Sequence, residues 1–519
     1  MGVLVNPYWL LTGSNTAIGA QLGDEPAGLA IDFLALLALV RGHTTNFLGD
    51  PNSLLTYSSP STKWITNGLG VLSSGTTLRC DHDPATLDSS TSSLTSLGVG
   101  TGIPIQMSVV TTGAVTYVAS QVVRITDAAD VTKWMVGTVV SWTAGTSTLV
   151  VNVYASTGYI SGSSWKVIVA LGVLIEEQQT NLLQSSEGYG ASPWTNNTAG
   201  STIVANDAIA PDGTMTADRY VESVNADGNG QGRRQTVSGL TASTTYRASF
   251  FAKAGGRNRC AAWSFSSGNT SSALFTLTGA GSVAGANNPR IVYVGNGWYR
   301  CSFDVVTVAA QTSRALHFGA QDAGNFKNYQ GDGASGCYFW GFQLELGSVE
   351  TSYIQTTSAQ VTRARDNISL ATSALPFSLT AGTLLTIGRR LGTNLSAMAV
   401  LDGNSGANRI INYAFNTGTS AQATMFTGGV AQYDLLNFGL QAAGTVVKMA
   451  SAWAANDAAA IANGGGSLAT DNTVSLPSVV TTLQFGDRPA SGWSLNGHLR
   501  QVKYLPRRAS NTEIQAMAA

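Results

Sequence analysis

The chain has 519 residues, of which only 11% are charged, and a formal net charge of −1. This length predicts about three or four domains rather than one. A hydrophobic content of 44% excludes a disordered chain, which needs low hydrophobicity and high net charge. The balanced charge argues against nucleic acid as a partner, because the neutralisation of phosphates needs clustered Lys and Arg.

The four cysteines, Cys80, Cys260, Cys301 and Cys337, are too sparse for a disulfide framework. None has the Cys or His spacing of a zinc site, so no metal and no cofactor is predicted. Cys301 alternates with Tyr299 and Phe303, which indicates a small buried core residue. We expect the cysteines to be mostly unpaired within the chain.

Residues 1–50 contain the apolar run Leu29–Val40, which carries Asp32. The run is too short for a membrane span, which takes about 20 apolar residues. No Lys or Arg precedes Arg41, so the charged start of a signal peptide is missing, and we expect synthesis in a reducing cytoplasm. A helix and a strand pair both fit the run. We expect it to dock on other subunits, with packing on the next domain of the same chain as an equal alternative.

Residues 51–90 form a predicted β lead-in that contains the cluster Asp81-His82-Asp83. Carboxylates and imidazole are good metal ligands, but adjacent strand residues point to opposite faces. A turn at Pro84 would be needed to bring them together. We therefore interpret the cluster as a hydrogen-bonded loop.

Residues 91–170 are predicted to be a small inserted β domain, barrel or sandwich. Within Thr148–Tyr154 apolar residues recur with the period of two that is expected of a strand. The expected strands are Gln121–Ile125, Val136–Trp142, Thr148–Tyr154 and Ser164–Val169.

Residues 171–366 are predicted to be a β-sandwich, because several strands alternate on one side. Tyr246, Ala248, Phe250 and Ala252 are expected to share one face. The same pattern is expected for Tyr299-Cys301-Phe303-Val305 and for Tyr338-Trp340-Phe342-Leu344. Such one-sided alternation calls for antiparallel sheets that pack face to face. Trp298 follows a Gly-Asn-Gly turn, so it fits a loop end or the core equally well.

Residues 367–519 are predicted to form a last β module that ends in a short helix. Ser510 and Glu513 have the spacing of a capping box, and Ile514 and Met517 give the helix an apolar face. The predicted fold class is thus all-β, with tandem antiparallel β-sandwich (jelly-roll) domains, a small β-barrel-like insertion and an N-terminal attachment segment.

A set of motifs in fixed order carries a resemblance to a known family. They are GVLIEEQQTNLL from Gly172, Trp194, APDGTMTAD (Ala210–Asp218), NGWYRCSF (Asn296–Phe303), YFWGFQLELGSVETSYI (Tyr338–Ile354) and VTRARD (Val361–Asp366). Together they resemble the β-sandwich module of bacteriophage tail-fibre and related virion structural proteins. The module is similar in outline to carbohydrate-binding jelly rolls. The ending Trp493–Met517 resembles the last strand and helix of concanavalin A-like or laminin-G-like sandwiches in phage proteins.

The resemblance implies a virion structural protein, located in a tail or another exterior fibre. It further implies attachment to other virion proteins through residues 1–50 and assembly as a homo-oligomer, with a trimer favoured. Three functions compete: an adhesin for host-surface glycan, an architectural collar, neck or capsid-decoration protein, and a glycan depolymerase. A depolymerase needs two carboxylates across the scissile bond. Because residues 371–519 contain a single Glu, Glu513, we expect no catalytic residue and no enzyme.

Sugar contacts are expected from loops that are rich in Asn, Asp and Gly, because the strands need their apolar alternation for the core. The best stacking platform is Trp493, although Trp493 could equally pack beside Leu495 and Leu499 in the core. The glycan-binding candidates are Trp493, Asp402, Asn404, Asn408, Asp487, Arg488 and Trp298.

Overall fold

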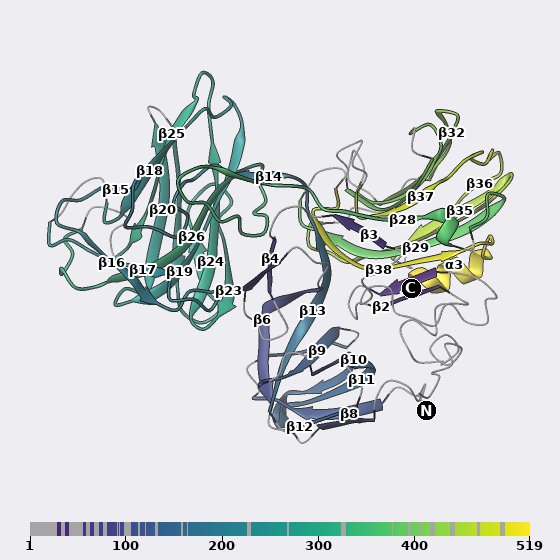
Figure 1. Ribbon diagram of the computed structural model, residues 1–519, viewed down its shortest axis with the longest axis horizontal. Coiled ribbons are helices and arrows are strands. Elements are labelled where there is room, and N and C mark those ends of the chain that lie inside the picture. The colour runs from purple at the N-terminus through teal and green to yellow at the C-terminus, as the bar shows by residue number, and fades with distance from the viewer. Residues whose placement is uncertain are drawn as a thin grey trace.

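The structure is a computed structural model of residues 1–519. It describes the segments 29–32, 37–40, 55–58, 63–66, 72–75 and 80–90, residue 92, and residues 94–97. From residue 105 to 519 it describes all residues except 113–114, 120, 130–132, 157–158, 163, 226–229, 267–268, 323–328, 376, 393–395, 404–405, 416–420, 436–441, 464–467 and 488–493. The described chain is all-β, apart from α3 (Asn511–Ala518) and two 3-10 turns. It forms three lobes (Figure 1).

The first lobe is a small barrel. Its strand order is β6-β13-β9-β10-β11-β8, and a bridge between Ser90 and Thr111 connects the last strand to the first. Val123, Ile125 and Trp165 lie in its buried core. The strands expected in this region are confirmed. The barrel consists of β6 (Cys80–Ser90), β8 (Ile105–Val110), β9 (Val122–Asp127), β10 (Trp134–Thr143), β11 (Thr148–Ser156) and β13 (Trp165–Ile175), beside the hairpin of β7 (Leu94–Leu97) and β12 (Tyr159–Gly162).

The cluster at residues 81–83 belongs to the strand β6, where a loop was expected. His82 pairs with Ala170 of β13, and Asp83 pairs with Val169. The pairing then jumps to Asp88 opposite Val167, so residues 84–87 form an irregularity in the strand. Proline has no backbone N–H to donate to a neighbouring strand, and Pro84 is tolerated because it lies in this bulge, where no such hydrogen bond is needed. Among the described residues, no group of three or more His, Cys, Asp or Glu could hold a metal ion.

The second lobe is a β-sandwich of two antiparallel sheets. One has the order β15-β18-β25-β20-β21-β22, and the other has the order β16-β17-β26-β19-β24-β23. Their strands are β15 (Thr195–Asn196), β16 (Thr202–Ala208), β17 (Ala217–Val221), β18 (Arg233–Ser238), β19 (Thr245–Gly255), β20 (Arg259–Ser266), β21 (Asn269–Thr276), β22 (Ser282–Ala284), β23 (Arg290–Gly295), β24 (Trp298–Val306), β25 (Ser313–Ala320) and β26 (Gly336–Leu346). The predicted inward residues of β19 and of β24 lie in the core between the sheets.

The alternation predicted for β26 is wrong at Tyr338 and Trp340, which do not share the face of Phe342 and Leu344. Phe339 and Phe342 both face the main core, whereas Trp340 belongs to a separate cluster on the outer face of the sheet. The reason is Gly341, whose φ of +66° accompanies a break in the pairing of β26 with β19. Such a bulge re-aims the following side chains, so a simple period of two fails there.

The third lobe is a second β-sandwich. One sheet has the order β3-β28-β37-β30-β31-β32-β33, and the other contains β36-β35-β34-β29-β38. Their strands are β3 (Leu55–Ser58), β28 (Asn367–Ala371), β29 (Ala381–Arg390), β30 (Ser396–Asp402), β31 (Arg409–Phe415), β32 (Gln422–Thr427), β33 (Val430–Leu435), β34 (Val447–Ala454), β35 (Asp457–Ala462), β36 (Ala469–Asp471), β37 (Thr482–Phe485) and β38 (Gly497–Leu505). The predicted capping box of Ser510 and Glu513 is confirmed at α3.

Strands from the first hundred residues are distributed over all the lobes. The run Leu29–Val40 forms the strand pair β1 (Leu29–Asp32) and β2 (Leu37–Val40), and β1 pairs with β38. The run thus packs on its own chain, as one of the two alternatives had it, but on the last domain and not on the next one. β3 joins the third lobe, whereas the hairpin of β4 (Lys63–Thr66) and β5 (Leu72–Gly75) lies at the second. The lead-in expected at residues 51–90 is therefore divided between lobes.

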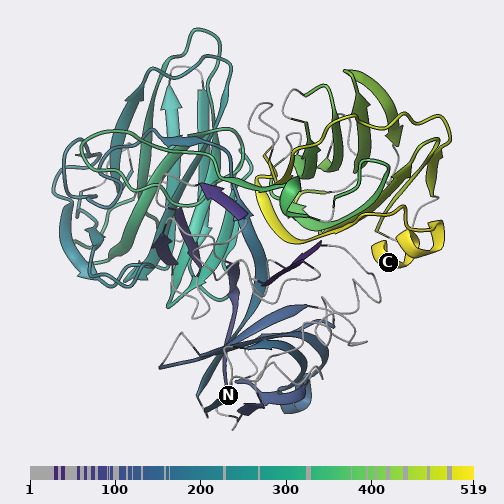
Figure 2. The same cartoon turned by 45° about the vertical axis from the view of Figure 1, so that its right-hand side comes forward.

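One strand connects the barrel with the third lobe. The first half of β13 lies between β6 and β9, and its end, Val173–Ile175, pairs with Leu499–Gly497 of β38. β38 also pairs with β29, so the sheets of two lobes are hydrogen-bonded into one (Figures 1 and 2). The short strands β14 (Gln179–Asn181) and β27 (Val361–Arg363) pair where the chain enters and leaves the second lobe.

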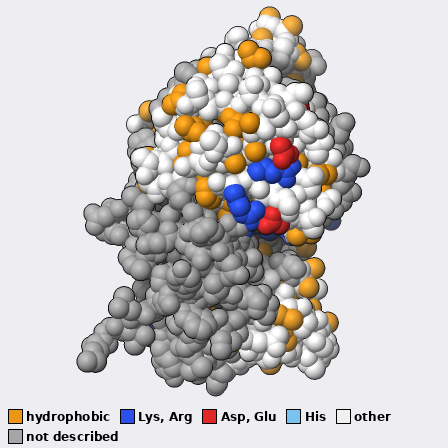
Figure 3. Space-filling view, turned by 90° about the vertical axis from the view of Figure 1, so that its right-hand side faces the viewer, with side chains coloured by type: hydrophobic (Ala, Val, Ile, Leu, Met, Phe, Trp, Pro, Cys, Tyr) orange, Lys and Arg blue, Asp and Glu red, His pale blue; other side chains and the backbone are white. Residues whose placement is uncertain are grey.

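The face of the third lobe shown in Figure 3 is mostly uncharged. The few Lys and Arg side chains visible there stand beside Asp or Glu side chains. In the third lobe, Arg507 forms an ion pair with Glu513, and Arg508 forms one with Asp457. No helix among the described residues is both long and apolar enough to cross a membrane.

The crossing of β13 from the barrel to β38 depends on Gly172. Its φ is +111°, and a Cβ atom there would lie 2.5 Å from the carbonyl oxygen of Leu499. We predict that Gly172→Ala lowers the free energy of unfolding by at least about 1–3 kcal/mol, the usual cost of such backbone strain. The control is Gly145→Ala, because a Cβ there meets nothing within 4 Å. Denaturant unfolding measures both, and equal stability of the two variants would contradict the prediction.

The three described thiols are buried and free: Cys260, Cys301 and Cys337. Burial raises the pKa of Cys260 and of Cys337, so these thiols stay protonated and unreactive. We predict that they react with an alkylating reagent only after unfolding. Mass spectrometry of non-reduced peptides checks this, and a stoichiometric Cys–Cys link would refute it.

Candidate functional site

The three lobes meet where β13 ends, and this junction is the candidate site. The carboxylate of Glu176 is 3% exposed there. Its oxygens accept hydrogen bonds from the backbone N–H of Ser352, at 2.6 Å, and from the Ser352 hydroxyl, at 2.7 Å. Nζ of Lys63 lies 3.7 Å from Glu176 Oε2, and Nη2 of Arg363 lies 3.6 Å from the same oxygen. Residues from three separate segments thus converge on one carboxylate, which belongs to a fourth.

A second carboxylate, Asp366, completes the cluster. Its Oδ2 accepts from the backbone N–H of Glu176 at 2.9 Å, and it forms an ion pair with Lys63. The backbone N–H of Asp366 in turn donates to the carbonyl of Glu176 at 2.9 Å. Lys63 also donates to the carbonyl of Leu174. We call Lys63, Glu176, Arg363 and Asp366 the junction cluster.

The junction cluster keeps Glu176 ionised. Burial raises the pKa of this carboxyl, but Arg363, Lys63 and the hydrogen bonds from Ser352 outweigh burial and lower its pKa to about 2. A buried charge persists only when it is paired and hydrogen-bonded. The cluster therefore fixes the segments of Lys63, of Glu176 and of Arg363 and Asp366 relative to one another.

The motif at Val361–Asp366 also reaches the third lobe. Nη2 of Arg363 donates to the carbonyl of Glu177 at 2.8 Å, and Nε of Arg365 lies 3.3 Å from Oδ2 of Asp487. The backbone N–H of Glu177 donates to Oδ1 of Asn496, just before β38, at 2.8 Å. The arginines of this motif therefore bind the end of β13 on one side and the third lobe on the other.

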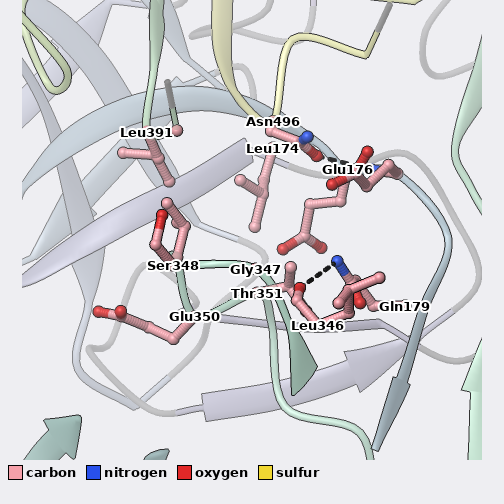
Figure 4. Close-up of a pocket in the computed structure, with 13 residues that line it drawn as sticks. Leu174, Glu176, Gln179, Leu346, Gly347, Ser348, Glu350, Thr351, Leu391 and Asn496 are labelled. Atoms are coloured by element: carbon pink, nitrogen blue, oxygen red, sulfur yellow. Dashed lines mark hydrogen bonds between the residues drawn. The ribbon is translucent and has the colours of Figure 1, made fainter. Parts of the chain in front are cut away.

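A pocket opens beside the junction cluster, with a volume of about 550 Å³ including the part that is open to solvent. It lies between the end of β13, the turn that follows β26, and the residues that flank β29 and β38. Figure 4 shows Leu174, Leu391 and Asn496 around the same space as Gln179 and Leu346. One amide hydrogen of Gln179 is donated to the carbonyl of Leu346 at 3.1 Å.

Glu350 lines the same pocket but is neutralised. Its carboxylate accepts from Nε of Arg247 and from Nη1 of Arg290, both at 2.9 Å. Burial raises the pKa of Glu350, yet these arginines, with Arg300, reverse the effect and lower it. Two of the three pocket carboxylates, Glu176 and Glu350, are paired with cations. The geometry therefore suits ion pairs that hold the lobes together better than a pair of carboxyls for acid–base catalysis.

The predicted sugar contacts do not come together in space. Asp402 and Asn408 lie at one end of β30, because Asp402 pairs with Thr482, while Asp487 follows the opposite end of β37 at the junction. All three side chains are buried, with exposed fractions of 3%, 9% and 1%. Asn404, Arg488 and Trp493 lie outside the described residues, so those predictions stay untested.

Trp298 is packed in the protein interior, which was one of the two positions expected for it. Its ring is 1% exposed, in the outer cluster with Phe251, Trp340 and Tyr353. Residues 209–216 contact this cluster: Trp298 donates to the carbonyl of Ile209 at 2.9 Å, and Trp340 donates to Thr216 at 3.0 Å. The APDGTMTAD motif is thus part of the packing around these aromatic rings, and Trp298 offers no ring face to a sugar.

Residues that sequence reasoning did not assign carry the junction: Lys63, Arg363, Arg365, Ser352 and Asn496. The signal that marks most of them was visible in the sequence, because VTRARD and GSVETSYI stand out as motifs in a chain that is poor in charge. Their partners were not visible, since Glu176 and Ser352 lie 176 positions apart.

Comparisons with known proteins give distant similarities only. No protein-family model and no curated protein matches the chain. The tandem CBM22-1–CBM22-2 domain of Xyn10C from Paenibacillus barcinonensis aligns with 64% of this chain and 97% of its own, at 10% identity and a TM-score of 0.21. Domain 4 of AbnA, a GH43 extracellular arabinanase from Geobacillus stearothermophilus, covers 32% and 81%, at 11% identity and a TM-score of 0.25.

Domains LG4-5 of the mouse laminin alpha1 chain cover 61% of this chain and 93% of their own, at 10% identity and a TM-score of 0.20. The chain is thus distantly similar to carbohydrate-binding modules and to laminin-G sandwiches. At TM-scores this low, the similarities carry no inference about what the chain binds.

We predict that Glu176→Gln destabilises the protein by about 3–5 kcal/mol, because it leaves the buried cations Lys63 and Arg363 without their shared carboxylate. The control is Glu177→Gln, the adjacent acid, which has no ion-pair partner among the described residues and should change stability by less than about 0.5 kcal/mol. Urea unfolding of both variants at neutral pH measures the difference. A smaller effect at position 176 than at 177 would contradict the role of the cluster.

The same variant has a predicted pH dependence. The pKa of Glu176 is lowered from 4.5 to about 2, so its ionised form stabilises the fold above pH 4.5. That contribution is lost as the pH falls towards 2, and the stability gap between the wild type and Glu176→Gln should narrow over this range. A gap that is constant from pH 6 to about 2.5 would show that the charge of Glu176 is not the stabilising feature.

Proposed function

We propose that the protein is a non-enzymatic structural protein of a bacteriophage virion, a tail fibre or spike that contributes to binding of host-surface glycan. The observation that carries the proposal is the junction. The motifs that resemble those of phage fibre proteins, GVLIEEQQTNLL and VTRARD, supply Glu176, Arg363, Arg365 and Asp366 to it.

A fibre component has to transmit position and force between its modules. The hydrogen bonding of β13 to β38 and the buried junction cluster give this chain fixed connections between lobes. Connections between domains are more often exposed linkers with few contacts. Individually weak sugar contacts become useful adhesion when several copies act together on one particle.

In this proposal the chain is made in the host cytoplasm and is carried on the exterior of the virion. Other virion proteins hold it through its N-terminal segment, and it assembles as a homo-oligomer, with a trimer favoured. Sugar contacts come from the loops of residues 367–519, with Trp493 as the stacking platform.

One observation favours a second candidate function, that of an architectural collar, neck or decoration protein without a receptor. Four of the proposed sugar contacts, Asp402, Asn408, Asp487 and Trp298, have buried side chains. Side chains in such positions serve packing and hydrogen bonding within the fold. An architectural protein needs the junction but no exposed sugar site.

The test separates attachment from adhesion. Particles are assembled with a chain that lacks residues 1–28, which keeps β1 on β38, and separately with Trp493→Ala in the full chain. We expect the first variant to be lost from particles, and the second to be incorporated normally but to adsorb less well to host cells. The copy number per particle is measured by quantitative mass spectrometry, and adsorption by counting unbound particles.

Normal incorporation of the truncated chain would place the attachment elsewhere in the protein. Normal adsorption of particles that carry Trp493→Ala would favour the architectural function. As a control, Asp457→Asn changes an exposed residue of the same lobe that pairs with Arg508, and it should alter neither incorporation nor adsorption.

A further inference from the structure

The pocket beside the junction cluster offers both hydrogen-bond acceptors and donors among its described residues. The carboxylate of Glu177 is half-buried there and has no ion-pair partner among the described residues. Gln179 donates one amide hydrogen to the Leu346 carbonyl, which leaves its Oε1 as an acceptor. Asn496 already accepts a hydrogen bond through Oδ1, so its Nδ2 is the donor that it can offer. A ligand that is rich in N–H or O–H groups fits this set.

Within the described part of the chain, the pocket also carries one negative charge without a partner cation. Glu176 is neutralised by Lys63 and Arg363, and Glu350 by Arg247 and Arg290. Glu177 is therefore the lining carboxylate whose charge, within the described part of the chain, is not matched by a cation. In a half-buried position such a charge favours a positively charged ligand group, because water screens the attraction less there.

The remaining lining is aliphatic. Leu174 and Leu391 lie on the side of the pocket formed by β13 and by the residues after β29, and Leu346, which is 54% exposed, comes from the end of β26 (Figure 4). An exposed leucine at the mouth of a polar pocket offers a surface for the C–H groups of a ligand.

We propose that this pocket binds a saccharide that carries a positively charged amino group, such as a hexosamine without its acetyl group. The ammonium group pairs with Glu177, hydroxyl groups bond to Gln179 and Asn496, and the C–H face of the ring packs on Leu346. The proposal deepens the glycan-binding part of the proposed function. It assigns a site at the module junction, where Leu391 and Asn496 of the third lobe face the end of β13 and the turn after β26.

The test uses the full chain and two probes, the trisaccharide of glucosamine and its fully N-acetylated counterpart. Binding is measured by isothermal titration calorimetry at a slightly acidic pH, at which the amino groups are charged. We expect the glucosamine trisaccharide to bind at least about tenfold more tightly than the acetylated form, since one charge-assisted hydrogen bond is worth about that factor.

Two variants locate the binding. Glu177→Gln keeps the shape of the side chain and should weaken the glucosamine trisaccharide by about tenfold, whereas Leu346→Ala should weaken it less because it removes only apolar contact. The matched control is Asp207→Asn, which removes one negative charge at an exposed pair with Arg219 outside the pocket and should leave binding unchanged. Thermal unfolding verifies that each variant is folded.

No binding of the glucosamine trisaccharide would overturn the proposal, as would equal binding of the acetylated form or full affinity in Glu177→Gln. A lysine-rich peptide serves as a third probe. If it binds in a Glu177-dependent manner and the saccharide does not, the pocket accepts a protein side chain instead. If particle adsorption does not change as predicted but the glucosamine trisaccharide binds, the result counts against the fibre function alone. If adsorption changes as predicted but the trisaccharide does not bind, the result counts against the pocket alone.

Discussion

The buried ion pairing at Glu176 is the interaction on which the arrangement of the lobes depends. Lys63 and the pair Arg363 and Asp366 come from separate parts of the chain, and each is satisfied only when the end of β13 lies where it does. The net stabilisation by such a cluster is small, because removing charges from water is costly. Its strength is geometric, since any other arrangement leaves a charge buried without a partner.

Two glycines allow the close packing that the cluster requires. Gly172 lets β13 approach β38, and Gly486 has a φ of +67° and lies where a Cβ atom would be 2.2 Å from Ile175. Larger residues at either point would push the strand ends apart. The backbone, the charges and the apolar contacts at the junction therefore favour one geometry, and the lobes are coupled more firmly than domains on a linker.

The placement of polar and aromatic side chains changes how the surface is interpreted. Trp298 and Trp340 on the outer face of the second lobe pack with the chain's own residues 209–216, and Asp332 accepts hydrogen bonds from the backbone N–H groups of its own loop. The pocket at the junction, in contrast, combines accessible apolar surface with Glu177, a carboxylate that has no ion-pair partner among the residues the structure describes. The junction is thus a better candidate for a binding site than the outer face of the second lobe, because that face is covered by residues of the same chain.

The sequence by itself determined the all-β class, the strands of the barrel, the inward faces of β19 and β24, and the helix cap at Ser510. These features follow from periods of two and from local side chain–backbone bonds, which are written in neighbouring residues. Only the tertiary structure decided that Leu29–Asp32 pairs with β38, that Trp340 faces outward after Gly341, and that Glu176 meets Lys63 and Arg363. Such contacts join residues more than a hundred positions apart or depend on a single bulge. A pattern of neighbouring residues predicts neither the distant partner nor the bulge.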